Sequence, residues 1–392
     1  MTASRPGEIR ALAGARALPP LLLVLYHYHE VHGFQHFRPF DLLVAKGYLW
    51  VEFFFALSGF VLVHVYSARA GALWSGRGYL SFLRARLARL YPLHVVTLLI
   101  MLAMILALRA LAAHGGYVSI YDAPGRHPYA TWPSFVASLF LVQAWHLFPS
   151  LSWNGVSWFV SVEFFLCLVF PLFLWLAQGP RWSAFALIAL PLATLGAIVR
   201  SSGHGLDVTF DFGVIRGLAD FGIGAGLAML YRRWKPRADA APEWQHTLAQ
   251  ALAAALFLCA VYRTGWSHAP SDFWVVPPLM LLLLVVAFDR GLLARLLSTR
   301  PLRVLGEWSF AIYLGQTTWL QLLRFAEERL YPDPPAEWAR AIHVAEPTAL
   351  VVLCVLWGSL LYRLVERPAT RLLRARLEAA PRSAPADRDG RS

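Results

Sequence analysis

Long apolar runs constrain the fold of this chain more than any other sequence feature. Runs of roughly 17–25 residues recur along almost the whole sequence, and this is the length that an α-helix needs to cross the hydrocarbon core of a bilayer. Charged residues make up only 15% of the 392 residues, where a soluble domain has about a quarter. Because the alternating pattern of a β-barrel is absent, the sequence predicts an all-α polytopic membrane protein.

About ten segments are predicted to span the membrane. A shorter apolar segment, residues 134–147, is too short to cross and is expected to be re-entrant or interfacial. The predicted spans are residues 15–32, 47–67, 92–112, 156–177, 183–200, 212–231, 247–263, 273–289, 305–325 and 346–365.

The basic residues predict the orientation of these spans. The net charge is +12, and Lys and Arg gather at alternate span ends, for example at residues 84–89 and 232–237. By the positive-inside rule this pattern fits an even number of spans with both termini in the cytoplasm, so the charge indicates topology and not nucleic-acid binding. We expect one integral-membrane domain over residues 1–376 and a disordered cytoplasmic tail, rich in Ala, Arg and Pro, over residues 377–392.

The cysteines give no sign of a metal site or of a disulfide framework. Cys167, Cys259 and Cys354 all lie inside apolar runs, where a cysteine is typically a small hydrophobic side chain. The sequence therefore predicts no bound metal.

His27 is the first candidate for chemistry. At about 1.5 Å per residue it lies roughly 16 Å along the first span from Arg16, near the middle of the bilayer. An imidazole at that depth needs a cavity or a partner, and its ordinary pKa of about 6.5 suits proton abstraction. The alternative is an interfacial histidine, because His29 and His32 follow closely, and the spacing alone does not decide between the two.

Arg86 and Arg89 are three residues apart and therefore share one helix face, just before Pro92, which is expected to open the third span. Their forked donors match the oxygens of a phosphorylated ligand at the cytoplasmic entrance. Anchoring to lipid headgroups is the commoner role for arginines at a span end.

Glu163 lies about two turns into another span, where a carboxylate needs a partner. It could orient or ionise His27, as a carboxylate does in a catalytic dyad. The structural alternative is a pair with Arg216, which lies in the middle of a span. Glu52 and Glu366 are further acids near span ends, and Arg363 or Arg367 could neutralise Glu366.

These motifs, in this order, resemble the acyltransferase-3 family of bacterial integral-membrane O-acyltransferases, from about residue 16 to residue 368. RALPPLLLVLYH is similar to the opening helix that ends in the family's catalytic histidine, here His27. GYLWVEFFFALSGF resembles the second-span signature, with Glu52 at the acidic position and Ser58 at the small-residue turn. RARLARLYP resembles the motif linked to the acyl-CoA donor, and it supplies Arg86 and Arg89.

The resemblance continues through the second half of the chain. NGVSWFVSVEFFLCLVFP is similar to the family's Trp-Ser-Leu-Ser-x-Glu segment and supplies Trp158, Ser161 and Glu163. LGEWSFAIYLGQ and YRLVERP resemble the two C-terminal signatures. Trp50 departs from a usual glycine, Phe159 from a serine, and Gln316 from a histidine that many members carry.

The resemblance implies a stand-alone, multi-pass enzyme of the bacterial inner membrane. It would move an acyl group, usually acetyl, from cytoplasmic acyl-CoA to a hydroxyl of a sugar or a lipid-linked surface glycan. In the mechanism that we expect, Arg86 and Arg89 hold the donor, and His27 acts as base with help from Glu163. Contacts to substrate would come from Glu52, Ser58, Trp158 and Ser161. A covalent acyl-histidine and direct transfer are equally consistent with these residues.

Other functions remain open on the sequence alone. Some members of the family acylate antibiotics or other small molecules. A glycan flippase also needs polar groups at mid-depth, although no inverted repeat is evident. An acyltransferase of the unrelated Asn/His class would need a buried asparagine, and Asn154, the sole asparagine, precedes its span.

Overall fold

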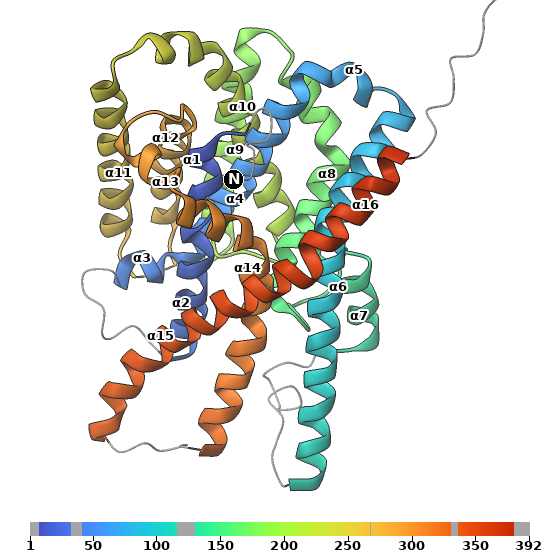
Figure 1. Ribbon diagram of the computed structural model, residues 1–392. Helices are drawn as coiled ribbons and strands as arrows, with labels where there is room; N and C mark the ends of the chain where they lie inside the picture. The colour runs from blue at the N-terminus through green and yellow to red at the C-terminus, as the bar shows by residue number, and fades with distance from the viewer. Residues whose placement is uncertain (1–7, 33–40, 116–129, 267, 331–335, 380–392) are drawn as a thin grey trace, which may run out of the picture.

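The computed structural model describes residues 8–32, 41–115, 130–266, 268–330 and 336–379, and every regular element in those ranges is helical (Figure 1). Short 3-10 segments precede α4, α8 and α12, another follows α4, and a π turn, Tyr362–Glu366, follows α15. The helices are α1 (Arg10–Ala15), α2 (Leu18–His32), α3 (Asp41–Ala45), α4 (Trp50–Tyr66), α5 (Ala70–Leu73), α6 (Gly76–Gly115), α7 (Trp132–Leu139), α8 (Trp158–Leu176), α9 (Arg181–Ser201), α10 (Gly213–Ala240), α11 (Glu243–Thr264), α12 (Val276–Ala287), α13 (Leu292–Leu297), α14 (Arg300–Leu330), α15 (Ala336–Leu361) and α16 (Arg367–Ala379).

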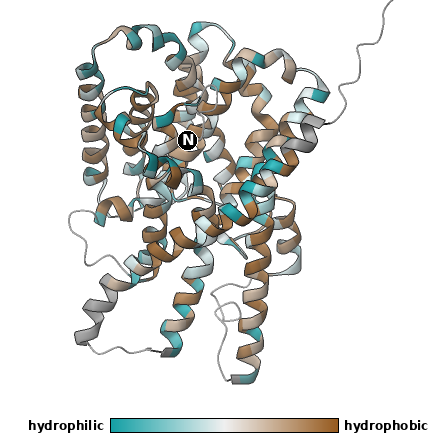
Figure 2. Cartoon of the chain, in the orientation of Figure 1, coloured by the Kyte–Doolittle hydropathy of each residue, from teal (hydrophilic) through white to brown (hydrophobic). Residues whose placement is uncertain are grey.

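The all-α polytopic fold that the apolar runs predict is confirmed. In the described part of the chain, 8 helical segments are long and apolar enough to cross a membrane, and Figure 2 shows hydrophobic residues along most of their length. The predicted spans 15–32 and 305–325 correspond to α2 and α14, which pack against each other within the bundle. The predicted tail, residues 377–392, lies outside the described residues except for the last turn of α16.

The prediction that Pro92 opens the third span is wrong. Pro92 lies inside α6, a continuous helix of 40 residues that carries Arg86 and Arg89 in the same rod as the apolar span. A proline has no N–H to donate to the carbonyl four residues earlier, which here is that of Ala88. The hydroxyl of Thr370 on α16 donates to this carbonyl at 3.4 Å instead, so packing from another helix satisfies the group that the proline leaves open.

The first part of the apolar segment 134–147 lies in a short helix, α7, and residues 140–147 are not helical. The side chain of Thr131 caps its first turn, accepting from the N–H of Ser134. The ring Nε2 of His94 on α6 lies 2.8 Å from the carbonyl oxygen of Ser138, so α7 is fastened to the flank of α6. The chain then turns back toward α8 through Leu141, whose φ is 60°.

The helices α4 and α10 approach each other so closely that their backbones touch. A Cβ at Gly59 would lie 2.2 Å from the carbonyl oxygen of Phe221, and one at Gly224 would lie 1.9 Å from that of Ala56. Only glycine permits this approach, which is the close backbone contact that small residues allow between membrane helices. The second-span signature therefore forms a central helix that carries site residues along its length.

Candidate active site

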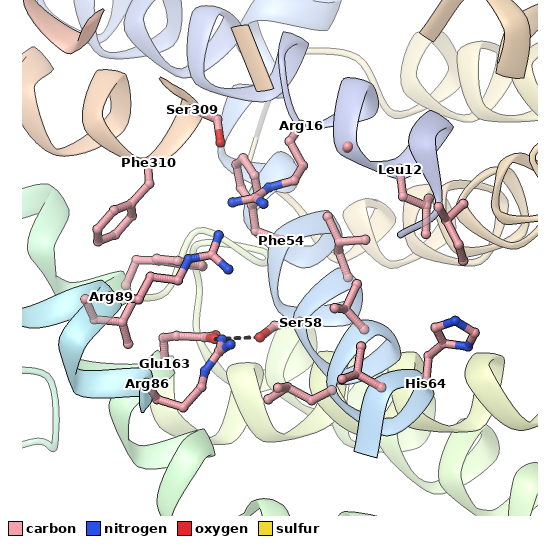
Figure 3. A pocket seen from close by; sticks show the side chains of 18 of the residues that line it. Leu12, Arg16, Phe54, Ser58, His64, Arg86, Arg89, Glu163, Ser309 and Phe310 are labelled. Atoms are coloured by element: carbon pink, nitrogen blue, oxygen red, sulfur yellow. Dashed lines mark hydrogen bonds and ion pairs between the residues drawn. The ribbon is translucent and has the colours of Figure 1, made fainter. Parts of the chain in front are cut away.

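A cavity of about 420 Å³ lies at the end of the bundle where the basic residues predict the cytoplasm, and we call it the inner cavity. Side chains from α4, α6, α8 and α14 and from the segment around α1 line it. Figure 3 shows the guanidinium groups of Arg16, Arg86 and Arg89 directed into one space that also holds Ser58 and Glu163. The rest of the lining is largely apolar and includes Leu12, Phe54, Leu57, Val61, Leu62, Val65, Leu90, Phe159 and Phe310.

The three arginines have different partners. Nη2 of Arg86 lies 3.4 Å from Oε1 of Glu163. For Arg16 and Arg89, the structure shows no hydrogen bond or ion pair to any described residue, although both act electrostatically on the buried carboxyl of Glu366. Guanidinium donors that the protein leaves open, at the wall of a cavity, are suited to phosphate oxygens.

Glu163 belongs to the inner cavity. The hydroxyl of Ser58 donates a 2.5 Å hydrogen bond to Oε1 of Glu163, and the carboxylate is only 4% exposed. Its second oxygen, Oε2, has no hydrogen-bond partner among the described residues, and neither has Nε of Arg86. Both atoms are themselves buried, although they belong to residues that line the inner cavity.

A second cavity of about 390 Å³ lies toward the opposite end of the bundle, and we call it the outer cavity. His27 lines it, so the histidine does not face lipid. Nδ1 of His27 lies 3.1 Å from Oε1 of Gln316, whose Nε2 donates to the carbonyl oxygen of Tyr313 at 2.9 Å. The imidazole therefore has both a cavity and a partner, the two conditions that the depth predicted from the sequence would require.

Aromatic and polar side chains form the remaining walls of the outer cavity. The hydroxyl of Tyr26 lies 2.9 Å from Oδ2 of Asp207 and 3.2 Å from Oε1 of Glu30. Trp158, at the start of α8, lines the cavity and stacks under the guanidinium of Arg216, with its ring centroid 5.7 Å from Cζ.

The two cavities meet at Val51 and Tyr313, which belong to the walls of both. Val51 is on α4, and the same helix lines the inner cavity further along, from Leu57 to Tyr66. Tyr313 is fixed by its hydroxyl, which donates to the carbonyl oxygen of Val156 at 2.8 Å. The cavities are thus arranged end to end along α4, with these two side chains between them.

Two of the expected substrate contacts lie outside both cavity linings. Glu52 is fully buried and receives two 2.8 Å hydrogen bonds from Arg216, through Nε and Nη2. Ser161 is also fully buried, and its hydroxyl donates to the carbonyl oxygen of Leu141 at 2.8 Å. Glu52 thus holds the guanidinium of Arg216 in place, and Ser161 holds the backbone at Leu141.

The structural alternative for Glu163, a pair with Arg216, is wrong, because both oxygens of Glu52 occupy that guanidinium. The hydrogen bonds of Glu163 to described residues go to Ser58 and Arg86, while His27 bonds to Gln316. The expected His27–Glu163 dyad is therefore not formed as a direct hydrogen bond among these residues.

Sequence reasoning missed Arg16 and Gln316. In the sequence, Arg16 looks like a marker of the inner end of the first span. Its position alone does not show that its side chain points into the inner cavity from the turn between α1 and α2. Gln316 stands out in the sequence only as a departure from the usual histidine. The other departures lie apart from His27: Trp50 packs against Phe257 on α11, and Phe159 lines the inner cavity.

Comparison with known proteins gives a consistent result. The sequence model of a family described as an acyltransferase domain, the acyltransferase-3 type, matches residues 9–363. A protein of Streptomyces mycarofaciens named "Acyltransferase MdmB" is 30% identical over 374 residues, which cover 88% of this chain and 86% of that protein. "Protein 2 in picA locus" of Rhizobium radiobacter is 33% identical over 172 residues, covering 40% of this chain and 84% of that protein. No solved structure matches the chain.

Proposed function

The chain belongs to the acyltransferase-3 family, and from that premise we propose that it transfers an acyl group, most readily acetyl, from acyl-CoA to a hydroxyl of a sugar or of a lipid-linked glycan. Multi-pass membrane character and O-acyltransferase activity follow from the family and the helices. The donor, the acceptor, the bacterial inner membrane as location and the residue roles are the proposal. The observation that carries it is the pair of cavities, one with open guanidiniums and one with the imidazole, which share Val51 and Tyr313.

The inner cavity is the donor site. Arg16 and Arg89 bind the phosphate groups of acyl-CoA through donors that no described residue occupies, and Arg86 lies beside them against Glu163. Ser58 and Glu163 line the same cavity and contact the pantetheine arm, whose amides can pair with the Ser58 hydroxyl. The apolar lining suits the thin chain that carries the thioester toward Val51 and Tyr313.

The outer cavity is the acceptor site. Its walls combine aromatic rings, from Tyr48, Trp153 and Trp158, with the carboxylates of Glu30 and Asp207. Apolar faces with a few polar groups that fix orientation are typical of small-molecule sites, and this mixture suits a polyhydroxylated ring. Trp158 is thus assigned to the acceptor, while Glu52 and Ser161 support the walls.

His27 acts as general base in this reaction. Its ring takes the proton of the acceptor hydroxyl as that oxygen attacks the carbonyl carbon of the thioester. The carbon–oxygen bond forms, the carbon–sulfur bond breaks, and the imidazolium returns the proton to the departing thiolate. The products are the acyl ester of the acceptor and free CoA, and no metal is needed to balance the reaction.

The experiment uses purified protein in lipid nanodiscs, with radiolabelled acetyl-CoA and a surface-glycan extract as acceptor. We expect label in the glycan fraction with the unaltered chain and none with His27→Ala, while both bind acetyl-CoA, because the donor arginines lie in the other cavity. Transfer at the unaltered rate by His27→Ala would remove the histidine from the mechanism. A flippase would neither bind nor consume acetyl-CoA.

A further inference from the structure

Gln316 is the last residue of the LGEWSFAIYLGQ signature, and it stands where many relatives carry histidine. We propose that Gln316 is a positioning residue that fixes His27 in the tautomer protonated on Nδ1, so that Nε2 is the nitrogen that accepts a proton. This inference rests on the proposed role of His27 as base. It concerns the state of the imidazole, which can also be measured without any reaction.

The orientation of the Gln316 amide follows from its second contact. Nε2 of Gln316 lies 2.9 Å from the backbone oxygen of Tyr313, one turn earlier on α14. A carbonyl oxygen can only accept a hydrogen bond, so the NH₂ group must face Tyr313 and the amide oxygen must face away from it. The side chain is fully buried, so solvent does not compete for either end of the amide.

The amide orientation determines the tautomer of His27. The amide oxygen Oε1 lies 3.1 Å from Nδ1 of His27, and since this oxygen also can only accept, Nδ1 must donate. A neutral imidazole carries one proton, so the lone pair is on Nε2. Nε2 has no hydrogen-bond partner among the described residues and is free for the acceptor hydroxyl. The opposite tautomer would place two lone pairs against each other and leave no base.

An amide differs from a carboxylate in one respect that a pH profile can detect. Gln316 orients the ring without adding a negative charge, so it does not favour the imidazolium as a glutamate would. The charged groups that share the outer cavity with His27 are Glu30 and His32 on α2, Arg216 on α10, Arg324 on α14, and Asp207. All of them stay the same in the variants below.

The first test reads the tautomer directly. Protein labelled with ¹⁵N-histidine is studied by two-bond nitrogen–proton NMR, and the His27 signals are those that vanish in His27→Ala. We expect a proton on Nδ1 in the unaltered chain and a mixture of both tautomers in Gln316→Met, which keeps length and volume but removes the acceptor. Gln143→Met is the matched control, because Gln143 is also buried but bonds to Ser157. An unchanged Nδ1 proton in Gln316→Met overturns the inference.

The second test uses turnover. Gln316→Met should lower kcat roughly 10- to 100-fold, as loss of an orienting partner does, with the KM for acetyl-CoA unchanged, because the donor cavity is not touched. Gln316→Glu can still accept from Nδ1, and its charge should move the acidic limb of the kcat–pH profile about one unit higher. A merely structural glutamine would reduce activity in both variants without moving that limb, and this result contradicts the proposal.

Failure of the inference and failure of the proposed function give different results. If the unaltered protein transfers no acyl group, the proposed function fails, while the NMR experiment still decides on the tautomer. In a second case, the unaltered protein transfers acyl groups, His27→Ala does not, and neither Gln316 variant changes kcat or the acidic limb of the kcat–pH profile. The proposed function then holds, and the proposed role of Gln316 is wrong.

Discussion

At the scale of single residues, Arg16 and Arg89, which bond to no described residue, are the most informative side chains of the inner cavity. Arg16→Gln and Arg89→Gln should each raise the KM for acetyl-CoA at least tenfold, since a hydrogen bond to a charged group contributes about 1.5–3 kcal/mol, and should change kcat little. The measurement is the initial rate against acetyl-CoA concentration. Arg84→Gln is the matched control, because Arg84 is exposed on the same helix and is not part of the cavity lining. An equal effect of Arg84→Gln would show that general surface charge is responsible.

The buried pair of Glu52 and Arg216 leads to a prediction about the stability of the fold and not about substrate binding. Glu52→Gln removes the charge that faces a fully buried guanidinium held by 2.8 Å hydrogen bonds. Breaking such a pair on one side costs about 3–5 kcal/mol, because the other charge stays buried and uncompensated. Thermal unfolding in detergent should show a clearly lower Tm for Glu52→Gln, and the double change with Arg216→Met should recover part of the loss. A single variant as stable as the unaltered chain would contradict this account.

At the scale of helices, the close approach of α4 and α10 makes a sharp prediction. Gly224→Val should strongly reduce the amount of folded protein, because even a Cβ at this position would lie 1.9 Å from the carbonyl oxygen of Ala56. Fluorescence-detected size exclusion of the solubilised protein measures the folded fraction. Gly71→Val is the control, since nothing lies within 4 Å of a Cβ added at Gly71. If both variants behave alike, the backbone contact does not hold the helices together.

The same scale shows what the sequence could reveal about the elements. Apolar length predicts the spans well because lipid imposes it, and α4, α8, α9 and α10 begin close to the expected residues. It cannot reveal that α6 continues through Pro92, because the group that satisfies the open carbonyl of Ala88 comes from Thr370, far away in the chain. Rules based on neighbouring residues predict that a helix begins or ends at a proline. Here the hydroxyl of Thr370 compensates for the missing hydrogen bond, and the helix continues.

The partners of the site residues were harder to predict for a related reason. The motifs single out His27, Glu163, Arg86 and Arg89, and the structure places all four in cavity linings. Nothing in their spacing shows that Glu163 and His27 belong to different cavities, since this depends on how α2 and α8 are placed around α4. Pairing between helices is decided by packing, which a single sequence does not display.

At the scale of the whole molecule, the orientation in the membrane is testable. The native Cys167 and Cys354 are buried and Cys259 is exposed, so all are first replaced by serine. In right-side-out vesicles, an impermeant maleimide should label His204→Cys, in the segment between α9 and α10, and should label Gly71→Cys only after the membrane is disrupted. Both positions are exposed. The reverse pattern would place the inner cavity outside the cytoplasm.

Val51 and Tyr313, which both cavities share, have a consequence for how the acyl group crosses the membrane. Under the proposed reaction, coenzyme and glycan each remain on their own side of the bilayer, and only a few carbon and oxygen atoms change compartment. Export of that small fragment needs no ion gradient and no rocking of helix bundles, because cleavage of the thioester supplies the driving force. The enzyme would then carry the acyl group in one direction across the membrane, and the acyl group would never be free in solution.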